Sequence, residues 1–145
     1  MPPKICYRSG YKYAFLGMYD EDGNYHRDYH CDIGIWCDDV ESEYIDIKDG
    51  WITIRYGYMN DGPSGPTIDT KSSMRGALEH DAGYQLMREG KLSRSYQEFF
   101  DRRLEQCMIE DGAWKVRASL WERGLSIFGR RNTDPANRKP VLVAP

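Results

Sequence analysis

A loop rich in glycine and proline divides this chain of 145 residues into two parts with different sequence patterns. Residues 62–66 read Gly-Pro-Ser-Gly-Pro, and such a stretch supports neither a helix nor a strand. Before the loop, apolar and polar residues alternate as they do in strands, and after it apolar residues recur at helical spacing. The sequence therefore predicts an α+β fold, with β structure over residues 1–59, a connecting loop over 60–71 and helices from 72 to 129.

The first part predicts an antiparallel β region. Tyr11–Tyr19 is an apolar and aromatic run, and Asp20–Asn24 after it has the composition of a hairpin turn. Tyr25–Trp36 alternates loosely. The clearest hairpin follows, where Asp49-Gly50 forms a tight turn and Ile52, Ile54 and Tyr56 alternate with more polar positions.

The second part predicts three helices, which complete a single domain ending at residue 129. Ser72 or Ser73 begins the first helix, and Ser93 or Ser95 begins the second. Apolar spacing from Trp114 to Phe128 indicates the third. The first helix is apolar on two sides and should be mostly buried, with Arg75 at its surface.

The first two helices carry the residues with the clearest chemical potential, which are His80, Asp81, Tyr84 and Asp101. His80 lies ten residues before Gly90 and Asp101 eleven after it. Residues equidistant from the turn of an antiparallel helix pair lie side by side, so the Asp101 carboxylate should face the His80 imidazole. Tyr84 lies one turn beyond His80 on the same face.

This arrangement suits hydrolysis of an ester. A carboxylate on one imidazole nitrogen fixes the tautomer and leaves the other nitrogen to accept a proton. Asp81, a second carboxylate beside His80, is suited to a hard cation. The alternative is a structural hydrogen bond between two helices, which is the more frequent role of such a pair.

His80-Asp81-Ala82-Gly83-Tyr84 resembles the His-Asp-x-Gly-Tyr signature of the bacterial and fungal phospholipase A2 group, which carries a second Asp about twenty residues later, as Asp101 does here. This resemblance covers roughly residues 60–129. The whole chain also resembles family 1353 of the domains of unknown function, a phage and prophage family with an N-terminal β region, a loop, His-Asp-x-x-Tyr and a later Asp.

The resemblance implies a phage-encoded, phospholipase A2-like hydrolase with a three-helix half. Its catalytic residues would be His80, Asp101 and Tyr84, and its substrate a phospholipid or another ester. A calcium ion would be held by Asp81 with Asp61 and Gly62 from the preceding loop. The alternative for Asp61 is a local turn in which its side chain binds backbone amides.

The charge distribution argues against a nucleic-acid partner. Residues 1–70 contain 13 acidic and 6 basic residues, a net charge of −7, whereas residues 71–145 have a net charge of +4. No apolar leader follows Met1, so we expect synthesis in the host cytoplasm without a signal peptide. The four cysteines lack the usual zinc spacing, although Cys31 and Cys37 with His26 and His30 are a possible zinc set.

Residues 130–145 form a basic, proline-containing tail that could dock on another phage protein as an extended segment. This suggests two alternatives to the enzyme. One is a non-catalytic virion component of the tail or capsid that keeps the scaffold. The other is a small-ligand or inhibitor protein of phage counter-defence. The enzyme itself could also be carried in the virion for envelope penetration.

Overall fold

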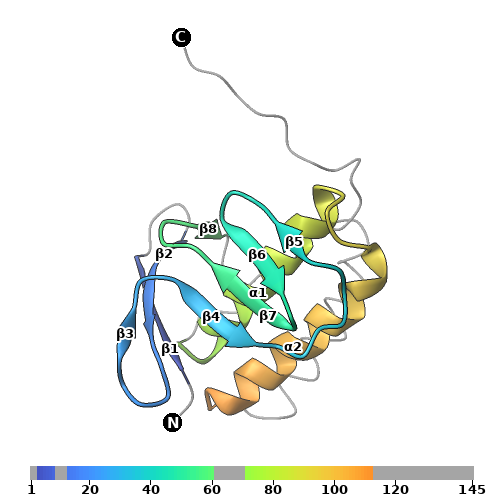
Figure 1. Cartoon of the computed structure of the whole chain (residues 1–145). Helices are drawn as coiled ribbons and strands as arrows, with labels where there is room; N and C mark the ends of the chain where they lie inside the picture. The colour runs from blue at the N-terminus through green and yellow to red at the C-terminus, as the bar shows by residue number, and fades with distance from the viewer. Residues whose placement is uncertain (1–2, 9–12, 61–70, 113–145) are drawn as a thin grey trace.

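The described part of the chain contains two antiparallel sheets and two α-helices (Figure 1). The computed structural model describes residues 3–8, 13–60 and 71–112. The first sheet consists of β1 (Lys4–Arg8), β2 (Tyr13–Tyr19), β3 (Tyr25–His26) and β8 (Met59–Asn60). The second has the order β4 (Tyr29–Asp32), β7 (Trp51–Ile54), β6 (Ile45–Lys48), β5 (Val40–Glu41). The helices are α1 (Lys71–Arg88) and α2 (Gln97–Glu110).

The second sheet follows directly from the alternation in its sequence. Ile45 and Ile47 on β6 pair with Ile54 and Ile52 on β7, and all four are at most 1% exposed. The two-residue turn between these strands has φ of 52° at Asp49 and 85° at Gly50. Two positive φ values are typical of the turn that matches strand twist, so the predicted hairpin is confirmed.

The first sheet is organised around β2. It pairs with β1 on one edge, and with β3 and β8 at opposite ends of the other edge. The predicted turn at Asp20–Asn24 is confirmed, because Asp20 Oδ1 accepts hydrogen bonds from the amides of Asp22 and Asn24. The predicted strand Tyr25–Trp36 is instead divided between the two sheets, because the chain leaves β3 at His26 and enters β4 at Tyr29.

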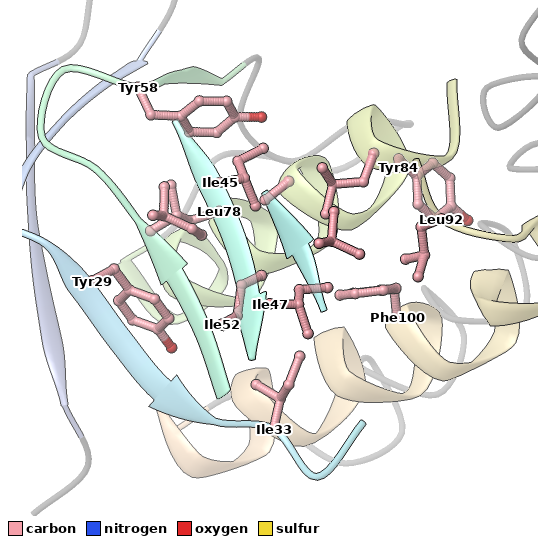
Figure 2. Close-up of a cluster of buried hydrophobic side chains, with 14 of the residues drawn as sticks. Tyr29, Ile33, Ile45, Ile47, Ile52, Tyr58, Leu78, Tyr84, Leu92 and Phe100 are labelled. Atoms are coloured by element: carbon pink, nitrogen blue, oxygen red, sulfur yellow. The ribbon is translucent and has the colours of Figure 1, made fainter. Parts of the chain in front are cut away.

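One hydrophobic core joins the sheets to the helices. Figure 2 shows Ile45, Ile47 and Ile52 of the second sheet in one buried cluster with Leu78 of α1 and Phe100 of α2. Phe15 on β2 and Tyr29 on β4 belong to the same buried cluster, with rings in an edge-to-face contact. The helices therefore pack against the β structure and do not form a separate unit.

The predicted fold class is wrong in its helical half. Within the residues that the structure describes there are two α-helices and one short 3₁₀-helix, Arg94–Tyr96, in place of a three-helix half. The third helix predicted from Trp114 to Phe128 lies outside the described residues. The physical reason lies in α1. A helix that is apolar on two sides must be covered on two sides, and here the second sheet covers one and α2 the other.

Candidate active site

The two α-helices form an antiparallel pair whose connection contains Gly90, two residues after the end of α1. Gly90 has φ of 72°, and the amide of Lys91 donates to the carbonyl of Leu86 to close the end of α1. Contacts between the helices run from Tyr84 with Asp101 near this turn to Arg75 with Asp111 at the far end. The predicted turn and antiparallel arrangement are confirmed.

Glycine allows the two helices to approach closely. A Cβ atom on Gly83 would lie 2.5 Å from the ring of Phe100, and one on Gly76 would lie 2.7 Å from Cδ1 of Leu104. Both distances are far below van der Waals contact, so a side chain at either position would displace the facing side chain or α2 itself. The glycine of the His80-to-Tyr84 motif therefore has a packing role, which is to bring α2 near enough for a short side chain such as Asp101 to reach α1.

His80 and Asp101 are joined by a buried hydrogen bond. His80 Nε2 lies 2.7 Å from Asp101 Oδ1, and the two residues are 4% and 0% exposed. The predicted contact between them is confirmed. An ionised carboxylate only accepts hydrogen bonds, so the proton of a neutral His80 resides on Nε2 and the lone pair on Nδ1.

Tyr84 completes this group. Its hydroxyl donates to Asp101 Oδ1 over 2.5 Å, so one carboxylate oxygen accepts from both His80 and Tyr84. The two rings also lie against each other, with centroids 4.0 Å apart. Burial and the neighbouring Asp101 raise the pKa of Tyr84, which therefore remains a neutral donor.

Opposing effects act on the protonation of His80. Burial is the largest single effect and lowers its pKa, but the hydrogen bond to Asp101 and the nearby Asp81 carboxylate together outweigh it. The pKa of His80 therefore lies above its ordinary value. Nδ1 faces Asp81 Oδ1 at 3.9 Å, beyond direct hydrogen-bond distance, so that contact is electrostatic.

Of the predicted calcium ligands, only Asp81 lies in the described part of the chain. Its side chain is 21% exposed beside His80, whereas Asp61 and Gly62 lie outside the described residues. Within the described ranges, no group of three or more His, Cys, Asp or Glu side chains is arranged to hold a metal ion. The possible zinc set does not assemble either, because His26 pairs with Asp20 and His30 with Thr53.

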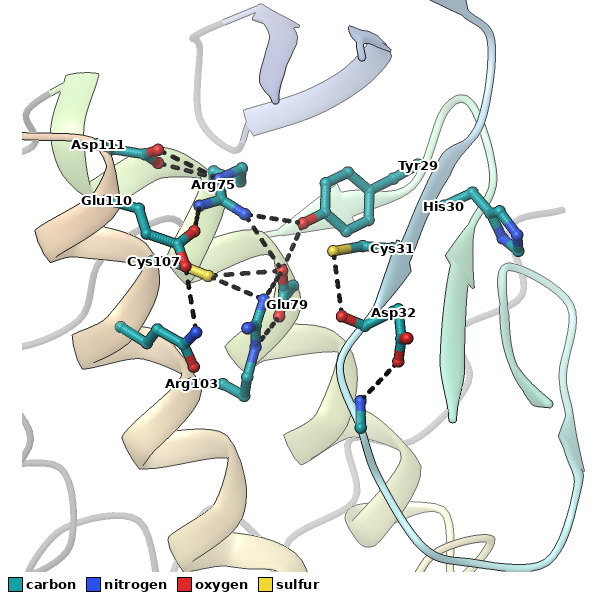
Figure 3. Close-up of polar contacts among 12 residues, drawn as sticks. Tyr29, His30, Cys31, Asp32, Arg75, Glu79, Arg103, Cys107, Glu110 and Asp111 are labelled. Atoms are coloured by element: carbon teal, nitrogen blue, oxygen red, sulfur yellow. Dashed lines mark hydrogen bonds and ion pairs between the residues drawn. The ribbon is translucent and has the colours of Figure 1, made fainter. Parts of the chain in front are cut away.

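The sequence interpretation missed a second polar group beside the first, centred on Glu79 and shown in Figure 3. Glu79 is fully buried and accepts hydrogen bonds from Arg103 and from the Tyr29 hydroxyl. Arg75, expected at the surface, is 2% exposed and binds Glu110 and Asp111. The signal available in the sequence was the presence of charged residues on helix faces that are otherwise apolar.

None of the described helices is long and apolar enough to cross a membrane. Comparisons of the chain with protein-family models, curated proteins and solved structures gave no match, so the resemblance to phospholipases rests on short sequence motifs alone.

Proposed function

We propose that this protein hydrolyses a carboxylic ester by general-base catalysis, with His80 as the base. The observation that carries the proposal is the double hydrogen bonding of Asp101 Oδ1, which accepts from His80 Nε2 and from Tyr84. This arrangement supports one tautomer, with the lone pair of Nδ1 on the side of the partly exposed Asp81. The substrate class, phospholipid, comes from the resemblance of the motif.

The proposed reaction needs one water molecule and one ester. Nδ1 of His80 takes a proton from the water while the water oxygen bonds to the ester carbonyl carbon. The tetrahedral intermediate then breaks its bond to the alcohol oxygen, and His80 returns the proton to that oxygen. The products are a carboxylic acid and an alcohol, which for a phospholipid are a fatty acid and a lysophospholipid.

Asp101 and Tyr84 act in this scheme as positioning residues. Asp101 retains the proton on Nε2 and stabilises the imidazolium that forms when Nδ1 is protonated. Tyr84 holds the carboxylate in place by donating to the same oxygen. Because this group is shielded from water, a small displacement of any member weakens the others.

Calcium enters the proposal only through Asp81. A carboxylate is a suitable ligand for this ion, and Asp61 and Gly62 are the further ligands that the resemblance implies. When bound, calcium would stabilise negative charge on the carbonyl oxygen. The described residues alone do not build the site, so the steps above use only side chains of the protein.

A non-catalytic scaffold is the second candidate, and the burial of His80 favours it. At 4% exposure, its pair with Asp101 is equally suited to joining α1 to α2. In that case the protein would act through its surfaces, as a virion component would. Removal of the His80 imidazole distinguishes the two candidates. It should abolish ester hydrolysis by an enzyme, whereas a scaffold has no such reaction to lose.

The test is release of fatty acid from phospholipid vesicles with anionic, zwitterionic or mixed headgroups, in calcium or in a chelator. We expect His80→Gln to lower the rate by roughly 10²-fold or more, which is the usual contribution of a general base. Asp101→Asn should lower it too, because an amide can favour the wrong tautomer. The double variant should be little worse than His80→Gln, since the residues act as one unit.

His26→Gln is the matched control, because His26 forms a His–Asp pair of the same 2.7 Å length with Asp20 at the surface. It should retain full activity. Circular dichroism and thermal unfolding establish that each variant is folded. If the wild-type protein cleaves no headgroup class in either condition, the hydrolase is excluded and the scaffold stands. If the wild type is active and folded His80→Gln is equally active, His80 is excluded as the base.

A further inference from the structure

Helix α1 is buried on all sides except the one that carries Asp81 and Gln85. From Met74 to Met87 every residue is buried except Asp81 and Gln85, which are half-buried. An amphipathic helix is oriented by its single apolar stripe, but α1 has apolar residues on opposite sides. The apolar pattern alone therefore selects the rotation of α1 about its axis only weakly. Gly76 and Gly83, which face α2 at close approach, and the polar contacts of α1 complete the selection.

The chemistry around His80 makes this rotation critical. Successive helical residues point about 100° apart, and the neighbours of His80 are Glu79 and Asp81. If α1 turned by one residue in either direction, a carboxylate would replace the imidazole opposite Asp101. Two carboxylates in that buried position would repel each other.

Glu79 provides a polar constraint on this rotation through the Glu79 cluster, which we define as Glu79, Arg103, Tyr29, Arg75 and Cys107. Arg103 donates from Nε and Nη2 to the two carboxylate oxygens of Glu79, each over 3.0 Å. Two parallel bonds of this kind fix angle as well as distance. The Tyr29 hydroxyl donates to the same carboxylate from β4. Glu79 is thus held from α2 and from the second sheet at once (Figure 3).

The remaining members of the cluster, Arg75 and Cys107, also contact the Glu79 carboxylate. Arg75 Nη1 lies 3.8 Å from Glu79 Oε2 one turn earlier on α1, and the Cys107 thiol lies 3.5 Å from the same oxygen. Within the described residues, the hydrogen-bond and ion-pair partners of this fully buried carboxylate are therefore all donors or cations. In a rotated helix Glu79 would lose its partners on α2 and β4, and a buried charge without partners is strongly unfavourable.

We propose that Glu79 is a positioning residue for His80: its bidentate pair with Arg103 and its bond from Tyr29 fix the rotation of α1 so that His80 faces Asp101. The consequence for catalysis rests on the proposed function, whereas the consequence for the His80–Asp101 contact does not. Buried ion pairs such as Glu79–Arg103 often contribute little net stability, so the role of this pair is to orient α1.

The test reads the His80–Asp101 hydrogen bond directly by NMR. A proton held on Nε2 between imidazole and carboxylate gives a downfield signal that is protected from exchange with water. The chain contains three histidines, so His80→Gln assigns the signal. In the double variant Glu79→Leu/Arg103→Met, which replaces the ion pair by apolar side chains of similar length, we expect the signal to disappear or its exchange to accelerate by roughly tenfold or more.

Glu98→Gln is the control, because it removes an exposed ion pair with Arg102 on α2 and should leave the signal unchanged. If the double variant does not fold, Tyr29→Phe decides by the same criterion, since it removes one bond to Glu79 and keeps the ring. An unchanged His80 signal in the folded variant would overturn the inference. If the variant loses the His80 signal and the wild type shows no hydrolase activity, this inference stands and only the proposed function is excluded.

Discussion

Replacing Gly83 with alanine should separate the two helices of the candidate active site. A Cβ atom there would lie 2.5 Å from Cγ and Cδ1 of Phe100 and 2.6 Å from Cε1. Nonbonded carbons are most stable about 3.5–4.0 Å apart, so the ring or the helix must move by about 1 Å. Phe100 is 0% exposed and belongs to the buried core cluster, so its ring moves only with its neighbours.

The magnitude follows from two opposing effects. Overpacking a core of this kind costs about 1–3 kcal/mol, and alanine recovers about 1 kcal/mol because it is a better helix former than glycine. Three contacts at 2.5–2.6 Å place this substitution in the upper part of the overpacking range, at about 2–3 kcal/mol. We therefore expect a net loss of about 1–2 kcal/mol in the free energy of unfolding and a Tm lower by roughly 3–8 °C. The hydrogen bond between His80 and Asp101 should weaken as well, because Phe100 directly precedes Asp101.

Thermal and urea unfolding measure the loss, and a double-mutant cycle with Phe100→Leu identifies its cause. The smaller side chain should relieve the contact, so the double variant should be more stable than the sum of the single effects predicts by about 1 kcal/mol. Gly76→Ala is a graded comparison, since its nearest neighbour is a terminal methyl group of Leu104. Full stability of Gly83→Ala, or additivity with Phe100→Leu, would refute the close-approach argument.

Three further predictions concern other parts of the molecule. The pKa of folded His80 is raised, so the stability that its protonation contributes is complete below the ordinary pKa of 6.5 and is lost as pH rises through the folded pKa. The difference in unfolding free energy between wild type and His80→Gln should therefore shrink with increasing pH. Urea titrations from pH 5 to 9 measure this difference. Gly50→Ala should lower the free energy of unfolding by about 1–2 kcal/mol, because φ of 85° is unfavourable for a residue with Cβ; an unchanged urea midpoint would contradict this. Burial raises the pKa of the Cys107 thiol, so this thiol should react with an aromatic disulfide reagent only after unfolding. The half-buried Cys6, Cys31 and Cys37 should react earlier, and mass spectrometry of the labelled protein measures the order.

The parts of this fold that sequence predicts correctly are those set by local pattern. The β6–β7 hairpin follows from the alternation around Asp49-Gly50, because strand period and turn chemistry act over a few residues. The His80–Asp101 contact follows from counting outward from Gly90, because two helices joined by a short turn can pack only within a narrow range of registers.

The parts that sequence does not predict depend on partners distant in the chain. Met59–Asn60 is too short to show a strand pattern, and it becomes β8 only because β2 offers an edge beside Tyr13 and Ala14. Arg75 and Glu79 are charged and would be assigned to a surface. They are buried because each finds its counter-charge on α2, and residue type alone does not reveal that pairing.

The pairing of β2 with β8 also bears on the order in which the protein folds. All four strands of the second sheet lie between β3 and β8 in the chain, so this pairing closes a loop that contains that entire sheet. Closing a long flexible loop is entropically unfavourable, and native contacts between distant residues slow folding. Prior formation of the local β6–β7 hairpin and its neighbours would shorten the flexible part of the loop. We therefore expect the second sheet to form early and the β2–β8 contact to form late, near the end of the folding reaction.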